Sequence, residues 1–151
     1  KNSINTFAQN VAGSLRSGGR FVCTTLNGEK IFDKLLTQHS IESSELKKWK
    51  ITKKYSDEID SFVASERSLG KTIEVYVSSI GQSIKEYLVH PDYLQTIMAD
   101  YGLKMIEKVN FSDVYLKEGA SSNYGDMKKL QDDSDLMEYS SFNMFFVFEK
   151  E

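Results

Sequence analysis

The segment that most constrains the fold is residues 142–148, which read FNMFFVF. A strand with one face in water alternates apolar and polar residues, whereas here only Asn143 interrupts the apolar run. We therefore expect this segment to lie inside a sheet. The chain has 151 residues, of which 40% are hydrophobic, and this is enough to build one domain around such a sheet.

The N-terminal part of the chain predicts a helix, a strand and a second helix. Residues 2–15 carry apolar side chains at helical spacing, and Gly18-Gly19 ends that helix because glycine accepts left-handed backbone angles. Residues 20–26 (RFVCTTL) are rich in β-branched and aromatic residues, as in a buried strand. After a turn at Asn27-Gly28, helical spacing resumes at Ile31. This alternation is typical of an α/β sheet.

Later segments predict three more strands and one more helix. The strands are expected over residues 50–55, 71–77 and 103–111. The helix begins at Pro91, because proline lacks the N–H that a first helical turn leaves unbonded. His90 is interpreted as the residue of helix entry rather than as a base. Residues 119–135 are polar and irregular and predict a loop.

Charge and metal-binding residues exclude several classes of function. Lysine and arginine number 19 against 22 aspartate and glutamate residues, so only a local patch could bind nucleic acid. The single Cys23 cannot form an internal disulfide, and one cysteine with two histidines argues against a structural zinc site, so no metal is expected. No apolar run is long enough for a transmembrane helix, and we expect no membrane partner.

Three short motifs have both a functional and a structural interpretation. Residues 65–72 (SERSLGKT) imitate a phosphate-binding loop, but the first glycine is missing and a strand follows, which favours a turn. Residues 47–55 (KKWKITKKY) favour a solvated hairpin balanced by the acidic residues at 57, 58 and 60, although lysines and aromatic rings also suit single-stranded RNA. Residues 83–86 (SIKE) match a capping box, in which Glu86 would bond the backbone at a helix start.

Three segments carry a further pattern: residues 15–31 (LRSGGRFVCTTLNGEKI), residues 73–115 with EYLV at 86–89 and YGL at 101–103, and residues 138–150 (EYSSFNMFFVFEK). Taken together, they resemble messenger RNA cap guanine-N7 methyltransferases. Their order and spacing also agree, and the form is most similar to capping enzymes of large DNA viruses, asfarvirus- and poxvirus-like.

The resemblance implies an α/β fold, the C-terminal half of a class I (Rossmann-like) methyltransferase sheet with an antiparallel last strand. Residues 1–151 would be the C-terminal part of a single methyltransferase domain, with variable insertions at about 38–70 and 117–136. The chain contains no G-x-G sequence. We therefore expect the site for the cofactor, S-adenosylmethionine (SAM), to lie mostly outside this segment, and the segment alone to be inactive.

The resemblance also implies a function, which is methyl transfer from SAM to N7 of the guanine in a GpppN cap, within a viral mRNA-capping enzyme. Its partners would be the capped 5′ end of RNA and other capping domains or a stimulatory subunit. Its location would be the cytoplasm, at a viral factory or in a virion, or the nucleus in a cell. The alternative is a non-catalytic, methyltransferase-like subunit that stimulates a capping enzyme. A fragment of a small-molecule methyltransferase is a third, weaker interpretation.

No catalytic residue is expected, because N7 of guanine carries a lone pair and no proton, and positioning suffices for the transfer. The resemblance instead implies residues that bind the cap. Glu86 would accept hydrogen bonds from guanine N1–H and N2–H, and Tyr87 and Thr25 are weaker candidates.

Two positions depart from the family pattern. Asn143 stands where cellular members place a tyrosine that contacts the cap, so Phe142 or Tyr139 would have to supply an aromatic surface. Asparagine can still form a hydrogen bond to a ribose or a base edge. Leu26 stands where the family has a proline, which keeps an apolar wall of different shape.

Overall fold

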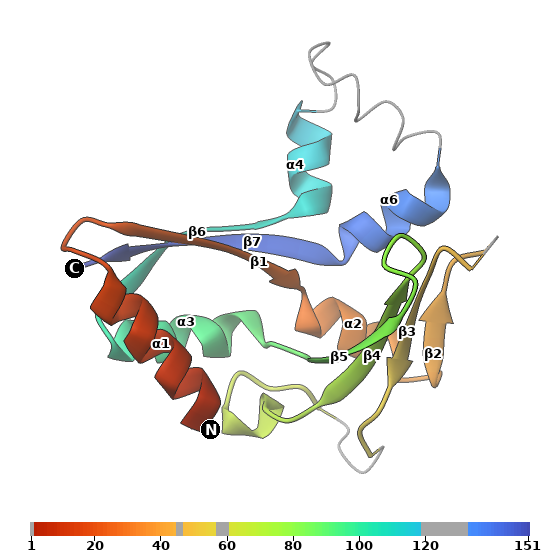
Figure 1. Ribbon diagram of the computed structural model, residues 1–151, viewed down its shortest axis with the longest axis horizontal. Coiled ribbons are helices and arrows are strands. Elements are labelled where there is room, and N and C mark those ends of the chain that lie inside the picture. The colour runs from red at the N-terminus through yellow and green to blue at the C-terminus, as the bar shows by residue number, and fades with distance from the viewer. Residues whose placement is uncertain (1, 45–46, 57–60, 119–132) are drawn as a thin grey trace.

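The computed structural model describes residues 2–44, 47–56, 61–118 and 133–151, and they form two antiparallel sheets that meet at an angle (Figure 1). The elements, which include the 3₁₀ helix η1, are α1 (Asn2–Ser14), β1 (Arg20–Leu26), α2 (Gly28–Lys34), β2 (Ser40–Glu42), β3 (Trp49–Lys53), η1 (Glu66–Ser68), β4 (Thr72–Val77), β5 (Ser83–Tyr87), α3 (Pro91–Asp100), β6 (Leu103–Asn110), α4 (Phe111–Glu118), α6 (Ser134–Ser141) and β7 (Asn143–Lys150).

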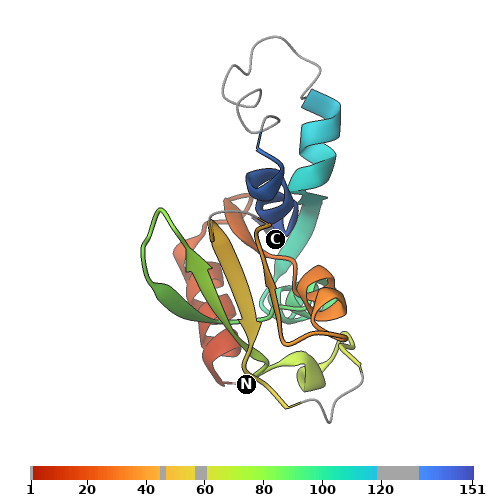
Figure 2. The ribbon, with the colours of Figure 1, turned by 90° about the vertical axis from the view of Figure 1, so that its right-hand side faces the viewer.

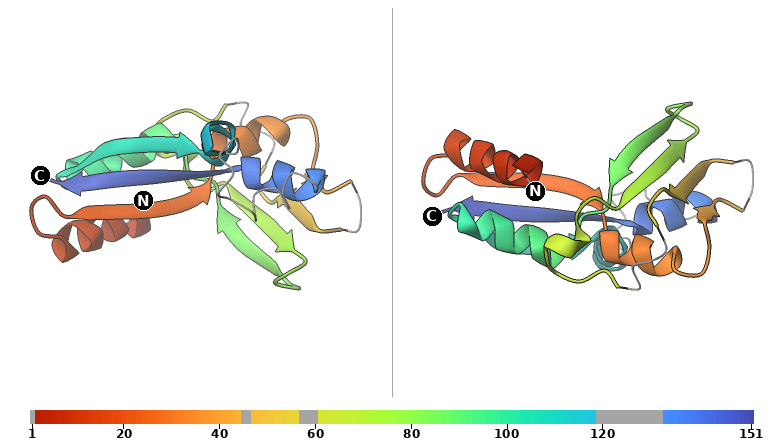
Figure 3. Two further views of the ribbon diagram at one scale, coloured as in Figure 1. Left: turned by 90° about the horizontal axis from the view of Figure 1, so that it is seen from above. Right: turned by 90° about the horizontal axis from the view of Figure 1, so that it is seen from below.

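The first sheet has the strand order β1-β7-β6, with the apolar C-terminal segment as its central strand (Figure 1). β7 is antiparallel to both neighbours, with Cys23 opposite Phe146 on one side and Val109 opposite Phe145 on the other. α1 and α3 lie across one face of this sheet (Figure 3) and help to bury Phe146 and Phe148 completely. The predicted α/β fold with an antiparallel last strand inside the sheet is confirmed.

β1 is less buried than its sequence predicts. Within the described part of the chain it pairs only with β7, so it lies at the edge of the sheet. Its residues alternate between exposed and half-buried, and Val22 is 63% exposed. The expectation of a buried strand is therefore wrong for one face of β1, because the helices cover only the other face.

The second sheet has the order β2-β3-β4-β5 and comes from the middle of the chain (Figure 2). The predicted strands over 50–55 and 71–77 correspond to β3 and β4, whereas β2 and β5 are short and were not indicated by any apolar pattern. The inner face of the sheet packs against α2 and Phe142 through four buried residues of β3 and β4: Trp49, Ile51, Ile73 and Val75.

The capping-box interpretation of residues 83–86 is wrong. These residues lie in β5, paired with β4, and Glu86 is opposite Ile73 in the register. The motif describes only local backbone bonds, whereas the backbone here is bonded to the neighbouring strand. Glu86 is therefore not engaged at a helix start.

α3 begins at Pro91, as predicted. His90 is its N-cap, and its Nδ1 accepts a hydrogen bond from the N–H of Asp92 at 3.3 Å. The helix ends before Gly102, whose φ of 71° is in the left-handed region. The interpretation of His90 as a residue of helix entry is confirmed.

The sequence predicts a turn at residues 65–72 and a loop at residues 119–135. Residues 65–72 form η1 and a turn before β4, as the structural interpretation of SERSLGKT predicts. Of the loop expected at 119–135, residues 119–132 lie outside the described residues, and Asp135 belongs to α6, so the loop ends earlier than predicted. Among the described helices, none combines the length and apolar composition that a bilayer-spanning helix needs.

The two sheets approach each other at Gly28, the first residue of α2. A Cβ atom at this position would lie 2.3 Å from the carbonyl oxygen of Val89, in the connection between β5 and α3. Glycine permits this approach because it has no side chain. The contact places the start of α2, which follows β1 of the first sheet, against the connection that follows β5 of the second sheet.

Candidate functional site

Glu86 is a half-buried carboxylate on the inner, apolar face of the second sheet. It lies in the edge strand β5, directly opposite the fully buried Ile73, so the two side chains share a face. It forms no ion pair with any residue that the structure describes, and burial raises its pKa. A half-buried, uncompensated charge is unfavourable in the folded protein unless the donors of a ligand satisfy it, which makes Glu86 a candidate for binding a ligand.

Tyr139, on α6, packs against the core beneath the second sheet. Burial raises the pKa of its hydroxyl, and the charge of Glu86 raises this pKa further. Its ring is tilted against that of Trp49, with the centroids 5.8 Å apart. The side chain is half-buried, so it contacts the core and keeps part of its surface accessible.

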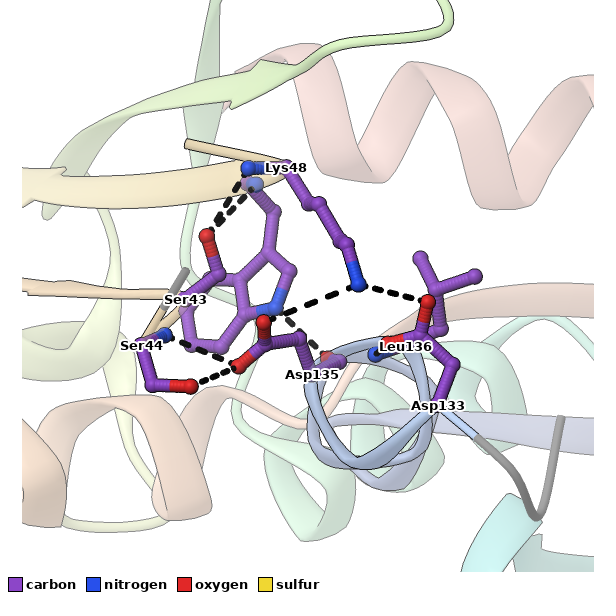
Figure 4. A network of polar contacts seen from close by, with 7 residues as sticks. Ser43, Ser44, Lys48, Asp133, Asp135 and Leu136 are labelled. Carbon is purple, nitrogen blue, oxygen red and sulfur yellow. Dashed lines mark hydrogen bonds and ion pairs between the residues drawn. The ribbon is translucent and has the colours of Figure 1, made fainter. Parts of the chain in front are cut away.

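A polar network fixes α6 to the second sheet (Figure 4). Oδ1 of Asp135 accepts hydrogen bonds from the N–H and the hydroxyl of Ser44, each at 2.8 Å. The backbone oxygen of Asp135 accepts a bond from Nε1 of Trp49 at 2.6 Å, and Nζ of Lys48 lies 2.6 Å from Oδ2 of Asp133. Sequence patterns gave no signal for this network, because Ser44 and Asp135 are 91 positions apart.

Phe142 and Asn143, at the junction of α6 and β7, are engaged within the protein. Phe142 is 3% exposed, and its ring meets Trp49 edge-on with the centroids 5.6 Å apart. Nδ2 of Asn143 donates to the carbonyl oxygens of Tyr139 at 3.0 Å and Ser140 at 3.4 Å. The ring of Phe142 is therefore part of the core and not a stacking surface, and the amide of Asn143 closes the end of α6.

Thr25 and Tyr87 lie at a different place, in a pocket of about 540 Å³ between α1, β1 and the β5–α3 connection. Most of the lining is apolar, with Phe7 from α1 and Leu88 beside Tyr87. Tyr87 follows Glu86 in the strand, so the two side chains point to opposite faces of the second sheet. The predicted site residues thus lie at three places. Glu86 is on the inner face of the second sheet, Thr25 and Tyr87 line the pocket, and Phe142 and Asn143 are at the junction of α6 and β7.

The lysines of residues 47–55 are largely engaged within the protein. Lys48 pairs with Asp133, Lys50 with Glu42 at 3.1 Å and Lys54 with Glu74 at 2.7 Å, and the buried Lys53 donates to the backbone oxygen of Leu35 at 3.0 Å. The predicted hairpin is confirmed by the pairing of β2 with β3, but the expectation that it is solvated is wrong, because Trp49 and Ile51 are buried. The acidic partners expected at 57, 58 and 60 lie outside the described residues.

The fold is similar to that of a methyltransferase of known structure. The chain superimposes on the CcbJ methyltransferase of Streptomyces caelestis with a TM-score of 0.51 and 15% identity, over 97% of this chain and 52% of that one. At this level of identity the likeness concerns the fold alone, and it confirms the predicted class I methyltransferase type of sheet.

The chain belongs to the mRNA (guanine-N(7))-methyltransferase domain family, whose model matches residues 1–150. It is 28% identical over 124 residues to a probable mRNA-capping enzyme of Acanthamoeba polyphaga mimivirus, which covers 75% of this chain and 10% of that protein. It is 24% identical over 164 aligned positions to the mRNA-capping enzyme catalytic subunit of fowlpox virus, which covers 97% of this chain and 18% of that protein. The predicted resemblance to viral capping enzymes is confirmed, and the chain spans less than a fifth of either relative's length.

The start of α2 does not fit a SAM-binding loop. Such a loop leaves the N–H groups at a helix start open to the ligand. At the start of α2, the one described helix that directly follows β1, the side chain of Asn27 already accepts from the N–H groups of Glu29 and Lys30, and Val89 covers Gly28. The described residues also contain no cluster of metal-ligating side chains.

Proposed function

We propose that this chain is the cap-binding part of a guanine-N7 methyltransferase domain in a viral-type mRNA-capping enzyme. The substrate would be RNA with a GpppN cap, and the product would carry a methyl group on N7 of the cap guanine. The observation that carries the proposal is the half-buried Glu86 carboxylate, which has no ion-pair partner among the described residues. It lies on the apolar face of the second sheet, in a chain that belongs to the guanine-N7 methyltransferase family.

Glu86 has the chemistry to select guanine. A carboxylate can accept from N1–H and N2–H of guanine at the same time, whereas adenine presents an acceptor at N1 and is repelled. Methylation of N7 leaves a positive charge on the purine. The negative charge of Glu86 is therefore better satisfied by the transition state than by the neutral base, which is the condition for accelerating the reaction.

The transfer needs no base from this chain. N7 attacks with its own lone pair, so the work of the protein is to hold the guanine in line with the methyl donor. SAM supplies the methyl group when bound, and we propose that residues outside this segment hold it. This chain's own part is to bind the guanine edge, orient the ring and exclude water from it.

The remaining predicted residues take supporting positions in this proposal. Thr25 and Tyr87 line a separate pocket and stay weaker cap-binding candidates there. Asn143 and Phe142 would hold α6 in place rather than contact the cap directly.

The domain context is part of the proposal as well. Residues 1–151 would be one part of a single methyltransferase domain, and the partners would be the capped RNA 5′ end with other capping domains or a stimulatory subunit. We propose a cytoplasmic location, at a viral factory or in the virion. The fowlpox relative is named a catalytic subunit, which supports an enzyme over a non-catalytic stimulatory subunit.

The test is Glu86→Gln in the full-length protein, with methyl transfer to GpppA as the readout. The amide NH₂ would face a guanine donor at one of the two contacts, so a charge-assisted bond worth about 1.5–3 kcal/mol is lost. We expect kcat/KM to fall roughly 10- to 150-fold.

The matched control is Glu74→Gln in the adjacent strand. Glu74 pairs with Lys54 in an exposed ion pair, so its substitution should change kcat/KM by less than about twofold. Equal kcat/KM values for wild type and Glu86→Gln would refute the assignment of the cap site to Glu86.

A further inference from the structure

We propose that the pocket between α1, β1 and the β5–α3 connection binds the base of the first transcribed nucleotide, the N of GpppN. Lys85, on the neighbouring surface of β5, binds the phosphates that join this nucleotide to the cap guanine. This subsite rests on the proposed function and extends it from the guanine to the other end of the cap.

The pocket has a size and a lining that suit a nucleobase. Its volume is about 540 Å³, which is within the usual range for sites that bind small molecules. Two aromatic side chains line it and keep much of their surface accessible, since Phe7 is 43% exposed and Tyr87 is 58% exposed. A nucleobase is flat and has two apolar faces, so accessible rings of this kind can bind it by stacking.

Hydroxyl groups provide the polar part of the lining. Ser3 comes from α1, and Thr24 and Thr25 come from β1. A hydroxyl both donates and accepts hydrogen bonds, so it can satisfy the edge of any base. Stacking is also tolerant of base identity. The pocket therefore suits a nucleotide whose base varies, whereas the Glu86 carboxylate suits guanine alone.

β5 connects this pocket with the proposed guanine site. Glu86 and Tyr87 are consecutive in the strand, so their side chains lie on opposite faces of the second sheet. Among the described residues β5 pairs only with β4, and it is therefore an edge strand. A ligand can pass around such an edge from one face to the other. The 5′–5′ triphosphate of the cap is a flexible link between two nucleosides, as this path requires.

Lys85 provides a positive charge on this path. It is exposed, and its Nζ lies 5.6 Å from the centroid of the Tyr87 ring on the same face of the strand. Glu74 is opposite Lys85 in the register, but its carboxylate lies 2.7 Å from Nζ of Lys54. Lys85 forms no ion pair with any residue that the structure describes. A lysine beside an accessible ring is the combination that binds a phosphate and its base.

The experiment compares two ligands of the full-length protein. GpppA is the methyl acceptor, and GTP is measured as an inhibitor of that transfer. GTP has the same guanine and three phosphates but lacks the second nucleoside. Tyr87→Leu removes a stacking ring and should raise the KM for GpppA about tenfold relative to the inhibition constant of GTP. Tyr87→Phe keeps the ring and should leave this ratio within about twofold of the wild-type value.

Tyr76→Leu is the matched control for the ring. Tyr76 is half-buried in β4 on the same face of the sheet, opposite Ser83, and is not part of the pocket lining. This variant should leave the ratio within about twofold of wild type. A partial loss of folded enzyme changes neither constant, so the ratio reports on binding even where a variant is less stable.

A second pair of variants tests the phosphate contact. Lys85→Gln should raise the KM for GpppA and make it less dependent on salt, because one contact between a cation and a phosphate is lost. Lys104→Gln removes the same charge from an exposed position in β6 of the first sheet. It should change neither the KM nor its salt dependence.

The subsite is overturned if Tyr87→Leu raises both constants equally or leaves both at their wild-type values. An equal rise would mean that the pocket supports the guanine site or is filled by another part of the protein. Glu86→Gln separates this failure from failure of the proposed function, because a guanine contact affects GpppA and GTP alike. A loss at Glu86 with no selective effect at Tyr87 removes only the subsite. A selective effect at Tyr87 with normal activity of Glu86→Gln supports the subsite and removes the assignment of Glu86.

Discussion

The Glu86 carboxylate lies at a position where its charge lowers the stability of the folded protein. Burial on the apolar face of the second sheet raises its pKa above the ordinary value of 4.5, and the described residues offer it no ion-pair partner. A carboxyl group with a raised pKa is more easily ionised in the unfolded chain. Its charge at neutral pH therefore lowers the free energy of unfolding, as is common for groups that serve binding.

We predict that Glu86→Gln raises the melting temperature at neutral pH while it lowers methyl transfer. The destabilising effect of Glu86 is absent below the unfolded-state pKa, where the group is protonated in both states, and develops as pH rises. The gain in melting temperature should therefore disappear as pH falls below about 4. Thermal unfolding of the two proteins across this range checks the prediction, and a variant less stable than wild type at neutral pH would contradict it.

At the scale of elements, the junction of α2 with the β5–α3 connection decides where the two sheets meet. Gly28 begins α2, and the carbonyl group of Val89 lies where a Cβ atom would be. Phe62 also approaches this point, with its Cε1 atom 3.0 Å from that Cβ position. The close fit holds α2 against the strand that carries Glu86.

We predict that Gly28→Ala destabilises the protein by about 1–3 kcal/mol, the usual effect of forcing an extra methyl group into a packed site. The new Cβ would lie 2.3 Å from a backbone oxygen, so α2 or the β5–α3 connection must shift. Chemical denaturation provides the measurement. Equal stability of variant and wild type would show that this junction is loosely packed.

Gly13→Ala is the matched control for this prediction. Gly13 lies in α1, and no atom lies within 4 Å of a Cβ built there. Alanine is favoured over glycine within a helix, so this variant should be more stable than wild type by up to about 1 kcal/mol. The same substitution is thus expected to have opposite signs at the two positions.

At the scale of the whole molecule, two cores meet at the start of β7. One lies between the second sheet and α2 and includes Phe142, and the other lies beneath the first sheet and includes Phe146. Glu86 lies on the inner face of the second sheet, and Thr25 and Tyr87 line the pocket beside β1. The outer edge of β1 is unpaired among the described residues, and its exposed face carries Val22.

We predict that the isolated 151-residue chain does not bind SAM. Asn27 and Val89 cover the start of α2, and the sequence has no G-x-G loop to receive the cofactor. Isothermal titration calorimetry should detect no binding to the isolated chain. Micromolar affinity in that experiment would mean that the chain holds a SAM site of another kind.

Several elements of the fold could be predicted from the sequence because their signals are local. The spacing of apolar residues identified α1, α3 and β7, and Pro91 with Gly102 marked the two ends of α3. The family resemblance likewise depends on short motifs, and the match over residues 1–150 confirms it. Periodicity and capping are properties of neighbouring residues, so they can be recognised without knowledge of the tertiary contacts.

The candidate site was decided by the tertiary structure. The sequence motif placed Glu86 at a helix start, whereas pairing of β5 with β4 turns it onto the apolar face of a sheet. For residues 47–55 the sequence favoured a hairpin over an RNA contact, and the folded chain provides acidic partners for Lys48, Lys50 and Lys54. Strand pairing and the Asp135 network join residues far apart in the chain. The sequence by itself therefore determined the family and the local elements, and only the folded chain decided which side chains meet.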